Sequence, residues 1–225
     1  MSELITYQHS MHVGIDVGQV NDPTALAVVE RLRPVPDLRH LPAALHERAI
    51  KEAAETPKRL NLRYLERLPL GVLYPQQVEI IMARLFAPQL RGAHVYLDAT
   101  GVGRPVSQML RRAGARNLQG ITITSAQSPA RETADGWNVG KAELVNGVLI
   151  AMQVGELRLG RQVEHVDVLV KEMRDFRSRQ NPTTGNISFN AREGQHDDLI
   201  LAVSYAVFGA QRPTPVTSLD VRFAA

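Results

Sequence analysis

The chain has 225 residues, 44% of them hydrophobic, which is ordinary for a globular protein that buries a core. Its formal net charge of +3 is by itself too weak a cue to assign a polyanionic partner. The absence of cysteine excludes disulfides and thiolate metal sites, so any metal would be held by oxygen or imidazole. No secretory signal pattern and no apolar run of roughly 18 residues occurs, so we expect a cytoplasmic protein with no membrane partner.

The first predicted elements are β-strands. Two apolar runs in Met11–Arg31 flank the polar turn QVNDPT, a pattern typical of a hairpin. The segment 32–57 carries four prolines and many charges, which predicts a surface insertion that is partly helical over Ala43–Glu55. Leu62–Leu68 is expected to add a third strand.

Helices and strands alternate in the rest of the chain. Helical spacing of apolar residues in Tyr74–Ala87 predicts an amphipathic helix packed on a sheet. The other expected elements are strands at His94–Asp98 and Leu118–Ile123, helices at Pro105–Ala113, Asn138–Gln153, Val163–Phe176 and Asp197–Gly209, and a loop or hairpin at Arg179–Asn190. In the helix at Asn138–Gln153, Leu144, Val148 and either Leu149 or Ile150 should face inward.

This order of elements predicts the fold class. An antiparallel start that passes into β-α-β units indicates an α/β protein with a mixed sheet and helices on both faces. We expect residues 1–210 to form a single domain and residues 211–225 to form a flexible tail.

Basic residues gather in two stretches. They are Arg104, Arg111, Arg112 and Arg116 in the first, and Lys171, Arg174, Arg177 and Arg179 in the second. Each stretch is also explained as a solvated helix face. With no base-reading module apparent, such clusters suit contacts to a DNA backbone with little sequence preference.

Carboxylates at strand ends are candidates for a catalytic site. Asp16 lies in the apolar string GIDVG, where burial without a cation or strong donors is costly. Asp98 closes the strand HVYLD, and ligands bind at the carboxyl ends of strands in open α/β sheets. A salt-bridged or turn-capping role explains Asp16 equally well, and a turn-starting role explains Asp98.

A third acidic point is the string GQHDDL, which places His196, Asp197 and Asp198 before an apolar helix. A single Asp at this point is explained as a helix N-cap. Two adjacent acids leave at least one directed inward, which favours a functional role.

The three acidic points occur in the order found in the RNase H-like superfamily, whose carboxylates hold two divalent cations. Cleavage of a phosphodiester by in-line attack requires one cation to activate water and a second to stabilise the leaving oxygen. Mg²⁺ and Mn²⁺ prefer carboxylate oxygens, in keeping with a site that has no cysteine.

Within that superfamily the chain resembles the nuclease domain of viral terminase large subunits. The strings that carry the resemblance, spread from Val13 to Ala206, are GIDVG with NDPTALAVVE, LERLPLG-x-x-Y, VYLDATGVGRPV, the helix around GKAEL, and HDDLILA. The resemblance implies a two-metal endonuclease, using Mg²⁺ or Mn²⁺, that cleaves double-stranded DNA, as terminases cut concatemeric DNA during viral genome packaging.

The resemblance also implies roles for individual residues. Asp16 would bridge both metal ions and Asp98 would hold the second. Asp197 or Asp198 would hold the first, and Asp197 is preferred. Lys141, within GKAEL, would hold a phosphate of DNA, although a solvated lysine at a helix start is an equal explanation.

Arg104, in the string VYLDATGVGRPV, is a further candidate for DNA contact. A complete terminase large subunit also carries a packaging ATPase with a P-loop, and no P-loop motif occurs here. We therefore expect the partners to be double-stranded DNA and a packaging ATPase domain or other motor components, in the cytoplasm of an infected host cell.

Three alternatives stay open at this point. A Holliday-junction resolvase shares the same superfold. An actin-like or sugar-kinase ATPase also begins with a string like GIDVG, but it duplicates its core and shows a second phosphate loop that is not visible here. A non-catalytic scaffold that binds DNA or a portal protein is disfavoured by the presence of all three acidic points.

Overall fold

The computed structural model describes residues 4–18, 22–124, 129–175, 177–180, 187–190 and 197–213, with the backbone alone at 175, 177–180 and 187–190. Within these residues the main sheet has eight strands in the order β6-β7-β5-β4-β1-β2-β3-β8. The strands are β1 (Ile5–Asp16), β2 (Ala25–Pro36), β3 (Arg59–Arg67), β4 (His94–Asp98), β5 (Leu118–Thr124), β6 (Arg131–Thr133), β7 (Gly136–Gly140) and β8 (Leu157–Leu159).

The sheet is mixed. Strand β2 is antiparallel to both of its neighbours, β1 and β3, whereas β4, β5 and β7 run parallel to β1. The predicted antiparallel start and later β-α-β units are therefore confirmed. A separate hairpin, formed by β9 (Arg177–Gln180) and β10 (Ile187–Asn190), agrees with the loop or hairpin expected at that place.

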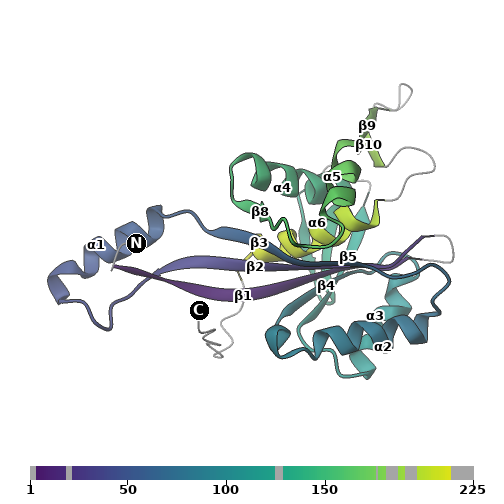
Figure 1. Cartoon of the computed structure of the whole chain (residues 1–225), viewed down its shortest axis with the longest axis horizontal. Helices are drawn as coiled ribbons and strands as arrows, with labels where there is room; N and C mark the ends of the chain where they lie inside the picture. The colour runs from purple at the N-terminus through teal and green to yellow at the C-terminus, as the bar shows by residue number, and fades with distance from the viewer. Residues whose placement is uncertain are drawn as a thin grey trace.

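Helices cover both faces of the sheet, as predicted (Figure 1). One layer holds α2 (Tyr74–Leu85) and α3 (Gly103–Arg112), and the other holds α4 (Lys141–Gln153), α5 (Val166–Asp175) and α6 (Asp198–Gln211). The short 3-10 turns are η1 (Ala43–Leu45) and η2 (Pro88–Leu90). Together η1 and α1 (His46–Glu55) account for the helix expected over Ala43–Glu55; α1 lies beside the far ends of β1 and β2, away from the two helix layers. No helix in the described part of the chain is long and apolar enough to cross a membrane.

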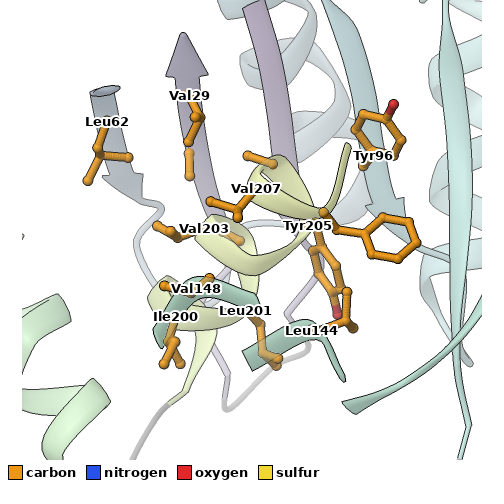
Figure 2. Close-up of a cluster of buried hydrophobic side chains, with 14 of the residues drawn as sticks. Val29, Leu62, Tyr96, Leu144, Val148, Ile200, Leu201, Val203, Tyr205 and Val207 are labelled. Carbon is orange, nitrogen blue, oxygen red and sulfur yellow. The ribbon is translucent and has the colours of Figure 1, made fainter. Parts of the chain in front are cut away.

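Helix α6 is the centre of the larger core. All its residues from Asp198 to Ala210 are buried, and Val203 and Val207 pack with Val29 of β2 and Leu62 of β3 (Figure 2). The helix crosses β1 at Gly14, where a Cβ atom would lie 1.9 Å from the carbonyl oxygen of Ala202. Only glycine permits this close approach of the two backbones, so β1 and α6 are held in one relative position.

The hairpin is longer than the sequence predicts. Residues 32–36, which we assigned to the insertion, continue β2 and pair with Ile5–His9 of β1. Two prolines in this stretch argued against a strand. They are tolerated because pairing with β1 in the folded chain decides the conformation here, and local propensity does not.

The helix expected at Asn138–Gln153 begins later, at Lys141. The preceding residues form β7, which pairs with β5, and neither β7, β6 nor β8 was predicted. The expectation that Leu149 or Ile150 faces inward is wrong, since their side chains are 40% and 58% exposed. Val145 and Ala151 are buried in their place, because with Leu144 and Val148 they follow the spacing i, i+1, i+4, i+7 that puts residues on one face of a helix.

The last helix does not end at Gly209 as predicted, but at Gln211. Gly209 instead lies under the ring of Tyr96, where a Cβ atom would come within 2.0 Å of a ring carbon. The glycine therefore serves helix-to-sheet packing and not helix termination.

Candidate active site

Asp16 and Asp98 end two neighbouring parallel strands. Ile15 of β1 is paired with Leu97 of β4, so the residue that follows in each strand is one of the two aspartates. Alternation along β1 puts Asp16 on the same face as Gly14, which touches α6. The two carboxylates therefore share one edge and one face of the sheet, the face that α6 covers.

The start of α6 brings the third acidic point to this edge. Asp197 is the N-cap residue of α6, yet its side chain makes no capping hydrogen bond. Its Oδ2 atom instead accepts a hydrogen bond from Nζ of Lys141, the first residue of α4, at 2.7 Å. Both side chains are partly exposed, so this ion pair opens toward solvent.

The carboxylates act on one another electrostatically. Burial raises the pKa of Asp16 well above its ordinary value, and the charges of Asp98, Asp197 and then Asp198 raise it further, while Lys141 opposes them. Burial also raises the pKa of Asp98, against hydrogen bonds from Thr100, whose backbone N–H lies 2.7 Å from Asp98 Oδ1. Asp16 keeps a partly accessible side chain although protein surrounds it closely. This edge of the sheet therefore favours a cation.

Asp198 has a different environment from its neighbour. Its side chain is 5% exposed, and both of its oxygens accept hydrogen bonds from Arg67 of β3. The distances are 2.7 Å from Nε to Oδ2 and 3.0 Å from Nη2 to Oδ1. Such a bidentate pair commits the carboxylate to the guanidinium, whereas Asp197 faces the other acids.

Arg67 also contacts Glu172 of α5, so one guanidinium serves two carboxylates. Burial raises the pKa of Glu172 to about 7, and Asp198 adds to the rise, against the opposing effects of Ile200 N–H and Arg67. Sequence reasoning missed both Arg67 and Glu172. No local pattern marks either residue, because their relation to Asp198 exists only in the folded chain.

A buried tyrosine also borders the carboxylates. Tyr205, two turns along α6 from Asp197, is fully buried, and its hydroxyl makes no hydrogen bond of ordinary geometry within the described residues (Figure 2). Burial raises the pKa of Tyr205 well above its ordinary value, and the charges of Asp16, Asp98 and Asp197 and an interaction of the hydroxyl with the Asp16 carboxylate add to the rise. The hydroxyl therefore lies beside Asp16, where it adds a polar group to the carboxylate cluster.

The donor set suits a hard divalent cation. Asp16, Asp98 and Asp197 offer carboxylate oxygens from three different elements, and the Tyr205 hydroxyl lies within their field. Among residues whose placement the structure describes, no three His, Asp or Glu side chains lie close enough to form a ready-made metal-binding group. The residues therefore fit Mg²⁺ or Mn²⁺ by chemistry and location, in an arrangement that is not closed.

The remaining predicted residues lie outside this cluster. Arg104 is exposed in the first turn of α3, in the helix layer on the opposite face of the sheet from α6. Lys171 and Arg174 are exposed on α5. His196 lies outside the described residues, as do the side chains of Arg177 and Arg179 and the tail from residue 214.

Comparison with known proteins identifies the fold. No protein-family model matches the sequence, and no curated protein matches it. By structure the chain is similar to the large terminase nuclease from thermophilic phage G20c, with a TM-score of 0.59 and 20% identity over 88% of this chain and 81% of that one. The same nuclease with bound magnesium gives a TM-score of 0.57 and 20% identity over 89% and 81%. The nuclease domain of the large terminase from bacteriophage SPP1, with bound Mn, gives 0.49 and 12% over 89% and 86%.

The similarity to the G20c nuclease extends over most of both chains, so the mixed sheet and its helices have a known architecture. The chain has an RNase H-like fold of the terminase nuclease type, as the sequence predicts.

Proposed function

We propose that this protein is a divalent-metal-dependent endonuclease that cleaves double-stranded DNA, as terminase nucleases do during viral genome packaging. One observation carries the proposal: Asp16, Asp98 and Asp197 come from three elements to one sheet edge. There the charges of Asp98 and Asp197 raise the pKa of Asp16. A fold similar to that of a terminase nuclease, one structure of which contains magnesium, supports it.

Asp16, Asp98 and Asp197 would supply the carboxylate oxygens that hold two Mg²⁺ or Mn²⁺ ions. When bound, such ions supply Lewis-acid activation of water and stabilisation of the leaving oxygen at a phosphodiester. Lys141 lowers the pKa of both Asp16 and Asp98 and so offsets part of the rise that burial causes. Because Lys141 lies at a partly exposed position beside Asp197, its ammonium group can also bind a phosphate of DNA.

The substrate follows from the chemistry of the surface. Lys171 and Arg174 on α5, and Arg104 on α3, are exposed cations that suit phosphates in a sequence-independent way. Double-stranded DNA is therefore the substrate that we propose, with a packaging ATPase domain or other motor components as protein partners.

Plasmid digestion tests this function. Supercoiled plasmid is incubated with the protein in Mn²⁺, in Mg²⁺ and in EDTA, and we expect nicking and linearisation with Mn²⁺ at least as fast as with Mg²⁺, and none in EDTA. Cleavage fragments should show no preferred sequence. Equal activity in EDTA, or no cleavage with either metal, contradicts the proposal.

A four-way junction substrate separates this function from that of a junction resolvase, which shares the superfold. The same protein is offered junction and linear duplex of equal length, in Mn²⁺. We expect similar rates on the two substrates. Cleavage confined to the junction contradicts the terminase-type activity and favours a resolvase.

A further inference from the structure

Arg67 reaches the start of α6 from across the sheet. It is the last residue of β3 and pairs with Ala25 of β2, which in turn pairs with Asp16 of β1. All three therefore lie at the same sheet edge. Arg67 is directed to the α6 face, whereas the neighbouring Glu66 pairs with Arg84 of α2 on the other face, as the alternation of strand side chains requires.

Asp198 is anchored by this arginine. The guanidinium meets both carboxylate oxygens, and the aspartate side chain is only 5% exposed. A buried carboxylate that lost this partner would carry a large penalty, so the pair holds the first residue of α6 in a fixed position relative to β3.

Glu172 provides a second link to the same turn. Its Oε2 atom accepts a hydrogen bond from the backbone N–H of Ile200 at 3.0 Å, while its other oxygen contacts Arg67. Ile200 is the third residue of α6, so its N–H belongs to the first turn and has no partner within the helix. An N-cap aspartate ordinarily satisfies this N–H. Here Glu172 does so, and the side chain of Asp197 makes no capping bond.

We propose that Arg67 and Glu172 are positioning residues: Arg67 anchors Asp198 and Glu172 caps α6, so that Asp197 is presented to Asp16 and Asp98 and not to its own helix. On this basis Asp198 supports the site without binding metal. The inference rests on the proposed function, because it assumes a metal site at these carboxylates and assigns Asp197, and not Asp198, to the metal.

The test measures Mn²⁺ binding by titration calorimetry, together with thermal melting and plasmid cleavage. In Glu172→Ala the Ile200 N–H loses its acceptor and Asp197 can turn to cap the helix. We expect the Mn²⁺ affinity to fall about 10- to 100-fold, as is typical when a residue that orients a metal ligand is lost. Glu172→Gln keeps an acceptor for Ile200, so its loss should be smaller than that of Glu172→Ala.

Glu66→Ala is the matched control. Like Glu172, Glu66 is a carboxylate paired with an arginine, in this case Arg84 at 2.9 Å. It lies next to Arg67 at the end of β3, on the other face of the sheet. The Mn²⁺ affinity and cleavage rate of this variant should equal those of the wild type. A role in folding alone would lower the melting temperature of Glu172→Ala but would not separate Glu172→Ala from Glu172→Gln in metal affinity.

If Glu172→Ala does not fold, Arg67→Lys provides the test of the positioning role. Lysine keeps the charge but cannot make the bidentate contact with Asp198, so Mn²⁺ affinity should again fall. Wild-type affinity in Arg67→Lys overturns the role of Arg67, and wild-type affinity in a folded Glu172→Ala, or equal losses in the alanine and glutamine variants, overturns the role of Glu172. A wild-type chain that neither binds Mn²⁺ nor cuts DNA overturns the proposed function itself.

Discussion

Two acids of the same hairpin have opposite surroundings. Glu30 of β2 is 5% exposed, and its oxygens are bonded to Asn61, Arg63 and His9 at distances from 2.5 to 3.1 Å. Burial alone would raise the pKa of Glu30, but these hydrogen bonds outweigh it and hold the pKa below its ordinary value. At Asp16 burial raises the pKa, and the neighbouring acids raise it further.

The contrast separates an acid whose charge is satisfied by protein donors from one whose charge is opposed by neighbouring acids. Glu30 sits among donors that satisfy its charge, so the protein needs it ionised in order to be stable. Asp16 sits among other acids, so its ionised form destabilises the protein unless a cation is bound. Substitution at these two positions should therefore separate stability from activity.

The largest effect is expected for Asp16→Asn. Loss of this charge weakens the site for both metal ions, so cleavage of plasmid in Mn²⁺ should fall about a hundredfold or more. The melting temperature without metal should stay the same or rise, because one of several mutually repelling acids is removed. DNA binding in metal-free buffer should fall little or increase, since basic residues provide it.

The comparison requires wild type and Asp16→Asn to be assayed side by side, each with and without Mn²⁺. Only the wild type should gain a large increase in melting temperature from the metal. A mutant that cuts at a rate near that of the wild type would show that Asp16 is structural and that the site assignment is wrong.

Glu30→Gln should give the opposite result. The variant loses charge-assisted hydrogen bonds with Arg63, so the free energy of unfolding at pH 7 should drop by about 1–2 kcal/mol. Because the folded-state pKa of Glu30 is lowered, this contribution exists above the unfolded pKa and disappears as the pH falls. Urea unfolding at pH 7 and pH 3.5 checks both points, and the cleavage rate of the folded variant should not change.

The stability of the metal-free protein should decrease as the pH rises, because several acids have a raised pKa in the folded state. Asp16, Asp98 and Glu172, the last with a pKa of about 7, have raised pKa values in the folded state, so they bind protons more readily there than in the unfolded chain. Their contribution to stability is therefore present below the unfolded pKa and is lost as the pH rises through the folded pKa. Melting temperatures from pH 5 to pH 8 should decline without metal, and less so in Asp16→Asn.

Saturating Mn²⁺ should flatten this decline, because metal binding releases the protons that the carboxylates hold. The number of protons released can be measured by calorimetry in buffers of different ionisation enthalpy. A metal-free melting temperature that climbs steadily between pH 5 and pH 8 contradicts the assignment.

The smallest effect is expected for Tyr205→Phe. Removing a buried hydroxyl that makes no hydrogen bond of ordinary geometry should change the stability of the metal-free protein by no more than about 1 kcal/mol. Because the hydroxyl lies beside the Asp16 carboxylate, the increase in melting temperature on adding Mn²⁺ should become smaller. Tyr96→Phe, which changes another buried tyrosine near α6, should leave that increase unaltered.

The sequence determined the order and type of most elements, because apolar spacing marks helices and strands locally. The strand at His94–Asp98 was predicted with the bounds that the structure has, and the helix at Tyr74–Ala87 nearly so. The pattern did not predict β6, β7 or β8, which are three to five residues long and are stabilised by pairing, β8 with the distant β3, β7 with β5 and β6 with the adjacent β7. Such short segments carry too little periodicity to be recognised.

The sequence also identified the acidic points, because an acid inside an apolar strand, or two adjacent acids before an apolar helix, can be recognised from the local pattern without the tertiary structure. It preferred Asp197 but did not decide between Asp197 and Asp198, since both fit a helix start. Tertiary structure distinguishes them. Arg67 of β3, over a hundred residues away in the chain, donates hydrogen bonds to Asp198, whereas Lys141 donates one to Asp197. Contacts between residues so distant in the chain depend on strand register and helix packing, which the local pattern does not encode.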